Sequence, residues 1–188
     1  NVNDYYSVAR LDPSYRIYWD NDFSDIPADL TAFKKMLNDL GAGAGDKLDN
    51  FLKEAEFKYR IGIGRLVFKP GQSVSEFLDW QMIKGVFRLD VFTSIKKHIA
   101  KHFHHPRIRQ MLEFPVLFLG ALPENTPALY SLMNYADIVG GTWYPSGGIY
   151  SVITGMHKLA VELGVDFKFN EEVTRISLDG ATAKAVTT

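Results

Sequence analysis

The chain has 188 residues with 21 basic and 22 acidic side chains, and its formal net charge is −1. This balance provides no positive field for a polyanion, so nucleic acid is excluded as an expected partner. Cysteine is absent, which excludes disulfides and thiolate metal sites and fits a reducing, cytoplasmic compartment.

The first predicted elements are short strands in residues 8–26 and a helix in residues 28–40. In the strand region, apolar and aromatic residues are interrupted by the turn-prone pairs Asp12-Pro13 and Asn21-Asp22. Gly41 is expected to end the helix. The apolar residues that recur at helical spacing are Leu30, Phe33, Leu37 and Leu40.

Residues 41–46, GAGAGD, resemble a phosphate-binding loop, but a simpler interpretation is favoured. A dinucleotide fingerprint needs a glycine where Asp46 stands, and it must follow a strand, whereas this loop follows a predicted helix. We therefore expect Gly41 to end one helix and Asp46 to cap the next. The buried face of the second helix is predicted to consist of Leu48, Phe51, Leu52, Ala55 and Tyr59.

The next region is expected to hold a turn at Lys69-Pro70-Gly71 and several linked helices in residues 73–114. His98 and His102 are four residues apart, so on a helix they would share a face and could bind a metal. Because the neighbouring residues are basic and no glutamate completes an H-E-x-x-H pattern, a solvated helix end is favoured and no metal is expected. Contact with anionic lipid head groups is the alternative for the basic cluster Lys96, Lys97, Lys101, Arg107 and Arg109.

Thr126 and Pro127 are predicted to start a further helix, as its N-cap and first-turn residues. Gly140 and Gly141 are expected to end it. Its apolar stripe is predicted to consist of Leu129, Leu132, Met133 and Ala136.

The last predicted helix covers residues 148–163 and is followed by two strands and a hairpin turn at Asp179-Gly180. The alternating residues of the strands are Val165, Phe167 and Phe169, and then Thr174, Ile176 and Leu178. The buried stripe of the helix is predicted to consist of Ile149, Val152, Ile153, Met156, Leu159, Ala160 and Leu163.

A turn lies between the helix that starts at Thr126 and the last predicted helix. It is formed by Trp143, Tyr144, Pro145, Gly147 and Gly148. The proline stiffens the turn, and the glycines let the backbone approach a flat, bulky group. The aromatic residues could form a wall of an apolar pocket. Ordinary packing at the start of a helix explains the same residues equally well.

Three tracts of the sequence resemble the bacterial-type phytoene desaturases, which are carotenoid desaturases of the FAD-dependent amine-oxidase-like superfamily. The tract most specific to the desaturases is MLEFPVLFLGALPENTPALYSLMNYADIVGGTWYPSGG. The tract GMHKLAVELGVDFKFNEEVTRI is shared more widely across the superfamily, and LDPSYRIYWDNDFSDIPADLTAFKKML precedes both in the right order. The resemblance covers nearly the whole chain.

The resemblance implies an α+β fold, with a mostly helical substrate-domain insertion, a small antiparallel sheet and a fragment of the FAD-binding domain. Residues 1–146 would be the substrate-binding tunnel domain, and residues 147–188 a truncated return into the FAD-binding domain. The parent protein would remove hydrogens from a long isoprenoid polyene, with hydride transfer to FAD. Because the family's N-terminal Gly-x-Gly-x-x-Gly and its C-terminal flavin motif are absent, the chain alone is expected to be inactive.

The resemblance also assigns roles to individual residues. Val173 would meet the adenine of FAD through its backbone, and Gly147 and Gly148 would form the flavin-facing turn. No catalytic residue is identified, although Asp79 falls where the family places polar groups near the flavin. The residues implied to line the polyene tunnel are Tyr135, Trp143, Tyr144 and Pro145.

An apolar polyene substrate dissolves in lipid, so peripheral contact with the membrane is expected. Removal from a larger flavoprotein would leave an apolar face exposed, which predicts self-association of the chain. Two alternatives stay open: a carotenoid isomerase or retinol-saturase-like oxidoreductase, and a non-catalytic module that binds apolar ligands or membranes.

Overall fold

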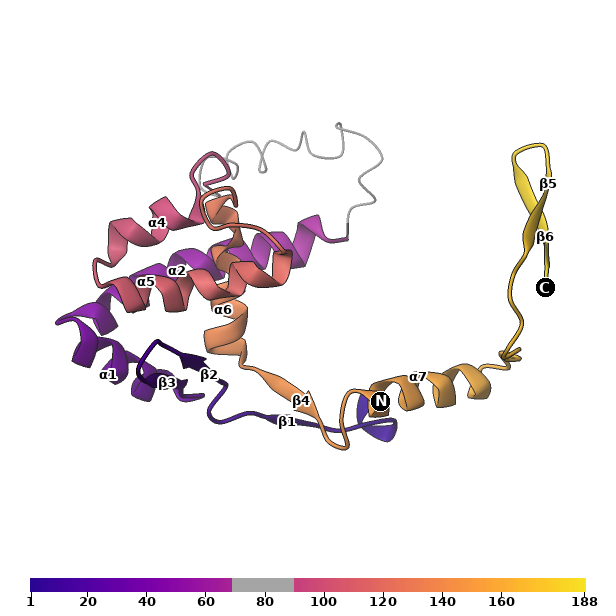
Figure 1. Ribbon diagram of the computed structural model, residues 1–188, viewed down its shortest axis with the longest axis horizontal. Helices are drawn as coiled ribbons and strands as arrows, with labels where there is room; N and C mark the ends of the chain where they lie inside the picture. Colours follow the sequence, from indigo (N-terminus) through magenta and orange to yellow (C-terminus); the bar gives the residue numbers. More distant parts are fainter. Residues whose placement is uncertain (69–89) are drawn as a thin grey trace. The chain divides into compact units, whose positions relative to one another are not determined.

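The computed structural model describes residues 1–68 and 90–188 and divides into two compact units (Figure 1). Unit 1 combines Asn1–Val8 with Pro145–Thr188, and unit 2 is the stretch Ala9–Tyr144. Helices predominate in the described part, and its strands form small two-stranded sheets. The fold is therefore of the expected α+β class.

The chain passes between the two units within strands β1 (Val8–Arg10) and β4 (Trp143–Pro145). These strands pair with each other in a two-stranded sheet. Next to this sheet, the backbone N–H of Leu11 donates to the carbonyl of Thr142 at 2.9 Å. Both points at which the chain passes from one unit to the other thus lie in one sheet.

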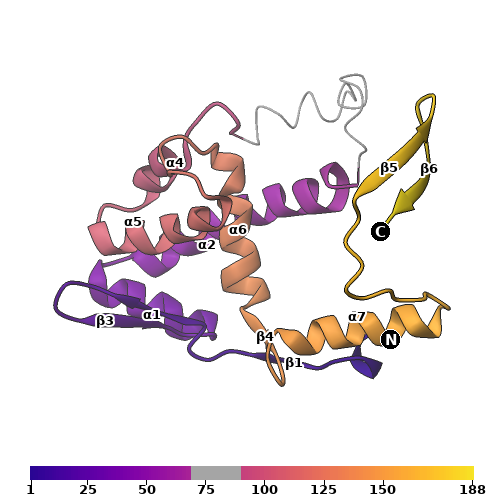
Figure 2. The ribbon, with the colours of Figure 1, turned by 45° about the vertical axis from the view of Figure 1, so that its right-hand side comes forward.

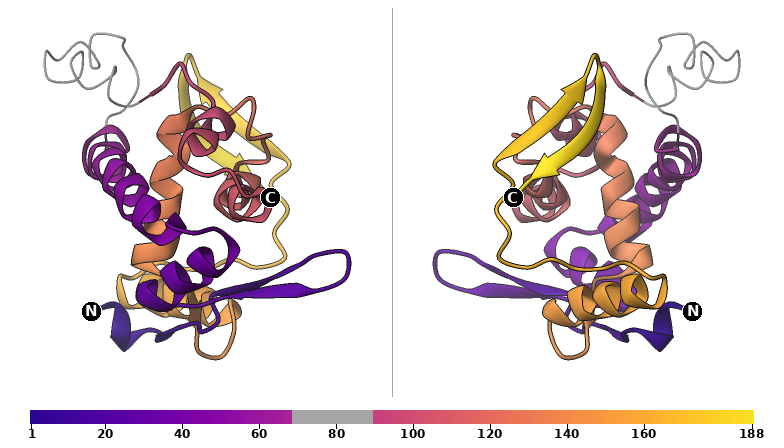
Figure 3. Two further views of the ribbon diagram at one scale, coloured as in Figure 1. Left: turned by 90° about the vertical axis from the view of Figure 1, so that its left-hand side faces the viewer. Right: turned by 90° about the vertical axis from the view of Figure 1, so that its right-hand side faces the viewer.

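A β-hairpin lies near the start of unit 2, in the region 8–26 where the sequence predicts short strands. Strands β2 (Tyr15–Tyr18) and β3 (Phe23–Ile26) are antiparallel and appear side by side in indigo in Figure 3. The N–H of Trp19 donates to the carbonyl of Asp22 at 2.7 Å and closes the turn. Arg16 and Asp25, which face each other across the strands, form an ion pair at 2.6 Å.

The helix predicted in residues 28–40 is α1 (Leu30–Leu40), and its N-cap is Asp29, whose side chain accepts from an N–H of the first turn. The next helix, α2 (Ala44–Ile61), does not have the expected cap at Asp46, which lies inside the first turn. Its N-cap is Gly43, with φ +74°, a value that glycine adopts without a steric penalty. The left-handed residue turns the chain directly from one helix into the next.

The hydrophobic core of unit 2 is built around α2, which contacts α1 and the short helix α6 (Leu132–Tyr135) that crosses it (Figure 2). Helices α4 (Ile95–His102) and α5 (Pro106–Glu113) complete this core. The buried face predicted for the second helix is confirmed at four positions, whereas Tyr59 is half-buried. The fully buried side chains include Leu37, Leu48, Phe51, Ile95, Ile99, Phe103, Ile108 and Leu112.

Part of the region 73–114 lies outside the described residues, and so do the turn expected at Lys69-Pro70-Gly71 and Asp79. Within residues 1–68 and 90–188, no helix combines the length and the apolar content needed to cross a bilayer.

Thr126 is not the N-cap that the sequence predicts. Its hydroxyl points backward and donates to the carbonyl of Leu122 at 2.9 Å, and Pro127 precedes a 3₁₀-helix instead. The segment runs through η5 (Ala128–Ser131), α6 and the π-helix η6 (Ala136–Gly140). The predicted end at Gly140-Gly141 is confirmed.

Unit 1 contains the 3₁₀-helix η1 (Val2–Asp4), helix α7 (Tyr150–Glu162) and an antiparallel hairpin of β5 (Arg175–Asp179) and β6 (Thr182–Thr187). The predicted hairpin turn at Asp179-Gly180 is confirmed.

The apolar stripe of α7 is exposed, contrary to the sequence prediction; 66% of Met156 is accessible, and Ile149, Ile153 and Leu163 are similarly open. The N-terminal segment packs on a different face of this helix, where Gly155 lies against Tyr5. The stripe therefore has no cover within unit 1.

The prediction of a strand at Val165, Phe167 and Phe169 is also wrong. A strand requires ladder hydrogen bonds to a neighbour, and none forms along this segment in the described chain. Instead the rings of Phe167 and Phe169 stack with their centroids 5.8 Å apart. The centroid of the His157 ring lies 4.4 Å from that of Phe167.

Candidate functional site

Strand β4 carries two of the aromatic residues that the sequence singled out. Trp143 and Tyr144 are both about half exposed. Because successive side chains of a strand point to opposite faces, only one of them can face a given wall of a pocket. The indole N–H of Trp143 donates to the carbonyl of Gly140 at 2.9 Å, which fixes its ring against the preceding turn.

A hydrogen-bond network around Asp137 positions this strand. The hydroxyl of Tyr15 donates to Oδ2 of Asp137 at 3.0 Å, and the hydroxyl of Thr142 donates to Oδ1 at 2.9 Å. Burial, followed by the charge of Asp137, raises the pKa of Tyr15. Gly141, with φ +85°, lies so close to the Arg10 guanidinium that a Cβ would come within 2.5 Å of it. The hairpin, the end of η6 and the start of β4 are thus held together.

Tyr135, another of the four residues implied for the tunnel, is half-buried in α6. Its ring centroid lies 5.4 Å from that of Tyr59 on α2. The pair places two phenol rings on the surface where α6 crosses α2.

The other residues implied by the resemblance belong to unit 1. Pro145 is buried, while Gly147 and Gly148 have φ values of +87° and +89°. The carbonyl of Gly148 accepts the hydroxyl of Ser151 at 2.8 Å at the start of α7. Val173 is exposed in the segment that leads into β5.

These features fit a peripheral part of an FAD site. Two consecutive glycines with positive φ keep the backbone before α7 free of side chains, and Val173 is about half exposed in the segment before β5. A glycine-rich loop for the pyrophosphate is not among the motifs of this sequence. The residues present would therefore contact only part of the cofactor.

An apolar cavity in unit 2 was not anticipated. It has a volume of about 270 Å³ and lies between the hairpin and the segment around η4 (Phe114–Leu119). Glu113 lies at its edge, and burial raises the pKa of this carboxyl group. The cavity is lined by Ile17, Trp19, Gln110, Glu113, Phe114, Leu117 and Pro123.

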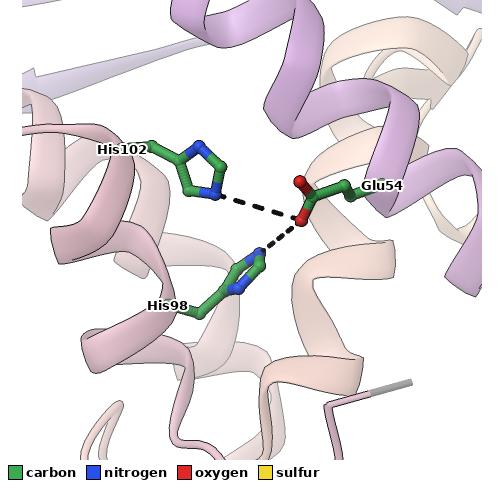
Figure 4. Close-up of side chains that lie close together, drawn as sticks. All are labelled: Glu54, His98 and His102. Carbon is green, nitrogen blue, oxygen red and sulfur yellow. Dashed lines mark ion pairs between the residues drawn. The ribbon is translucent and has the colours of Figure 1, made fainter. Parts of the chain in front are cut away.

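The histidine pair also differs from expectation. His98 is only 3% exposed, so it does not belong to a solvated helix end. Burial, with the nearby Lys58 ammonium, lowers its pKa to about 4. Figure 4 shows His98 and His102 both pointing toward Glu54 of α2. Sequence reasoning missed Glu54 because it lies on another helix, 44 positions before His98, where no spacing pattern links the two residues.

Comparison with known proteins identifies related sequences over the whole chain. A family model described as flavin containing amine oxidoreductase matches residues 1–188. A carotenoid 3,4-desaturase of Haloarcula japonica is 34% identical over 93% of this chain and 36% of its own length. A zeta-carotene-forming phytoene desaturase of Myxococcus xanthus is 27% identical over 98% of this chain and 36% of its own. A phytoene desaturase of Cercospora nicotianae is 28% identical over 95% of this chain and 30% of its own.

Proposed function

The chain belongs to the family of flavin containing amine oxidoreductases, and from this premise we propose that it is part of an FAD-dependent desaturase of a long isoprenoid polyene. The observation that carries the proposal is the 34% identity to a carotenoid 3,4-desaturase over 93% of the chain. Since the chain spans about a third of the length of such relatives, the activity is proposed for the intact protein.

The chain's own contribution is to bind and orient the substrate. A polyene offers few polar groups, so its recognition relies on buried apolar area, at roughly 25 cal/mol per Å². The half-exposed rings of Trp143 and Tyr144 on β4 and the Tyr59–Tyr135 pair supply such area. Bound FAD would supply the electron acceptor for the desaturation. The residues of this chain would hold the polyene and exclude water.

The two units correspond in this proposal to two roles. Unit 2 is the helical substrate lobe inserted into a flavin-binding domain, and unit 1 is part of that domain. Gly147 and Gly148 would let the flavin approach the start of α7, and Val173 would meet the adenine through its backbone. The exposed stripe of α7 would pack against further parts of the flavin-binding domain. The proposed functional boundary after residue 146 lies two residues beyond Tyr144, where unit 2 ends, and residues 1–8 belong to unit 1.

Peripheral membrane contact is the proposed route to a lipid-dissolved substrate. Phe118 of η4 is 74% exposed, and its apolar neighbours are also accessible. The N–H of Lys96 donates to the carbonyl of Pro123 at 3.3 Å, so the basic helix α4 starts beside this segment. An exposed apolar patch beside the start of a basic helix suits the surface of an anionic membrane. The patch consists of Leu117, Phe118, Leu119 and Leu122.

The test of the activity is expression of the intact protein in a host that accumulates phytoene, followed by lipid extraction and mass analysis. We expect products that have lost pairs of hydrogens, and a lower yield per bound FAD for W143A. The matched control is Y18A, which removes an exposed aromatic ring from β2, away from β4. Unchanged phytoene with FAD bound would contradict desaturation of phytoene, and a product of unchanged mass would indicate an isomerase.

Membrane contact is tested by flotation of the intact protein with vesicles that contain anionic lipid. The double variant L117E/F118E should stay in the aqueous fraction, whereas V186E, an exposed apolar residue of β6, should float as the wild type does. Equal flotation of both variants would refute the proposed patch.

A further inference from the structure

Helices α2 and α4 bring three potential metal ligands together in unit 2. Oε2 of Glu54 lies 3.6 Å from Nε2 of His98 and 3.9 Å from Nε2 of His102. One ligand atom from each of the three residues lies within 4.8 Å of the others. As Figure 4 shows, the two imidazoles project from α4 toward the carboxylate of α2.

The buried nitrogen of His98 points to a missing ligand. The side chain is 3% exposed, and in the part of the chain that the structure describes its Nε2 has no hydrogen-bond partner. Buried polar atoms in proteins are normally paired, so such an atom calls for an explanation such as an ion. The distances to Glu54 are too long for hydrogen bonds but leave space for an atom between the groups.

We propose that Glu54, His98 and His102 bind a divalent transition-metal ion of the zinc class. Two imidazole nitrogens and one carboxylate oxygen are a ligand set that suits Zn²⁺ and similar ions, whereas Mg²⁺ and Ca²⁺ prefer oxygen alone. Metal–ligand distances of about 2.0–2.2 Å require the three groups to close in slightly. Glu54 is 48% exposed and His102 is only partly buried, so both can move, and water can complete the coordination.

The surroundings of the cluster support the proposal. Nδ1 of His98 faces Oδ2 of Asp90 at 3.7 Å, on the side of the ring away from Glu54. The 3.7 Å separation is too long for a hydrogen bond, but the carboxylate stands at the nitrogen where a second carboxylate commonly orients a metal-binding histidine. The ring of Phe51 packs against both imidazoles, at 5.6 Å and 5.8 Å, and limits their rotation.

A nearby cation does not occupy the site. The ammonium of Lys58 pairs with Asp90 at 3.0 Å and donates to the carbonyl of Ala128 at 3.3 Å. Among residues 1–68 and 90–188, the ion pairs of the Glu54 carboxylate are those with the two histidines. A bound ion would link α2 to α4 and so stiffen the helical core of unit 2.

The experiment uses the intact protein after treatment with a chelator and dialysis. Zn²⁺ is titrated in competition with a chromophoric chelator, and Co²⁺ is added separately to record its visible absorption. The variants E54Q and H102Q alter the two more accessible ligands and leave the buried His98 in place. H104Q is the matched control, since His104 is an exposed histidine of the same segment outside the cluster.

We expect one equivalent of Zn²⁺ in the wild type and in H104Q, with an affinity at least about tenfold weaker in E54Q and H102Q. Zn²⁺ should also raise the thermal midpoint of the wild type in a concentration-dependent manner, and should do so less in H102Q. Equal Zn²⁺ affinity in all four proteins, or no binding to the wild type, would overturn the proposal. Neither readout depends on desaturase activity, so the outcome is independent of the proposed function.

Discussion

The ammonium of Lys58, on a side chain with 1% of its surface exposed, lies 3.0 Å from Oδ2 of Asp90. Asp90 has φ +52°, a conformation that asparagine also tolerates. D90N should therefore remove the charge without straining the backbone. It leaves a buried, unpaired ammonium, and we expect the free energy of unfolding to fall by about 2–3 kcal/mol in urea titrations.

K58M provides the comparison for this pair. Methionine fills a similar space without a charge, and the remaining Asp90 is one-third exposed and can be hydrated. K58M should therefore cost less stability than D90N. A larger loss for K58M would mean that Lys58 contributes mainly through the carbonyl of Ala128.

Glu113 should make stability depend on pH in a direction opposite to that of most carboxylates. Burial raises its pKa in the folded state above the unfolded value. Its protonated form is thus favoured by folding, and stability is lost as the pH rises through the folded pKa. E113Q should be more stable than the wild type at pH 7, by a margin that solvent keeps small because the group is partly exposed, and the difference should shrink toward pH 4. Chemical denaturation at the two pH values measures it.

Gly155 provides close packing between α7 and the N-terminal segment. A Cβ there would lie 3.1 Å from Cβ of Tyr5 and 3.1 Å from Cδ1 of Tyr6. Alanine favours a helix by about 1 kcal/mol over glycine, so G155A should keep α7 intact while it displaces the N-terminal segment. Hydrogen exchange of residues 2–6 should become faster. Y5F is the control, because it removes the 2.6 Å bond to Glu162 without adding bulk.

Asp137 is expected to control the placement of β4. D137N removes the charge that receives the Tyr15 and Thr142 hydroxyls, and should lower the free energy of unfolding by roughly 1–2 kcal/mol. If the proposed function holds, the product yield per bound FAD should fall as well, because Trp143 loses its support. T142V, which deletes one of the two bonds, should have a smaller effect on both. Full activity in a destabilised D137N would show that the hydrogen bonds of Asp137 are not needed for substrate binding.

The exposed stripe of α7 predicts self-association of residues 1–188. Ile149, Ile153 and Met156 lie on one face of the helix and are open to solvent. The double variant I153K/M156E should shift the elution of the chain toward that of a monomer in size-exclusion chromatography with light scattering. A wild-type chain that stays monomeric at high concentration would contradict the prediction.

Local patterns in the sequence predicted the elements that depend on local chemistry. The β2–β3 hairpin, α1 and the Asp179-Gly180 turn follow from periodicity and turn residues within each segment. The start of α2 was misplaced because the sign of φ at Gly43 is set by how two helices must join. Thr126 is not the cap because its hydroxyl donates backward to the carbonyl of Leu122 instead of accepting an N–H of the next turn.

Predictions that required knowledge of distant neighbours were less successful. Apolar periodicity placed the stripe of α7 correctly on one face, but it does not specify whether that face is covered. The interaction of Glu54 with His98 joins residues 44 positions apart, so no local spacing indicates it. The roles of Tyr135, Val173, Gly147 and Gly148 rest on the resemblance and remain predictions.

The pairing of β1 with β4 brings the entry and the exit of unit 2 to the same place. A lobe attached to its host by two neighbouring strands can be excised and the cut ends rejoined with a short bridge. During evolution, the same attachment would allow one lobe to be exchanged for another that accepts a different ligand. If the proposed division into a substrate lobe and a flavin-binding domain holds, such an exchange would leave the sequence of the flavin-binding domain unchanged.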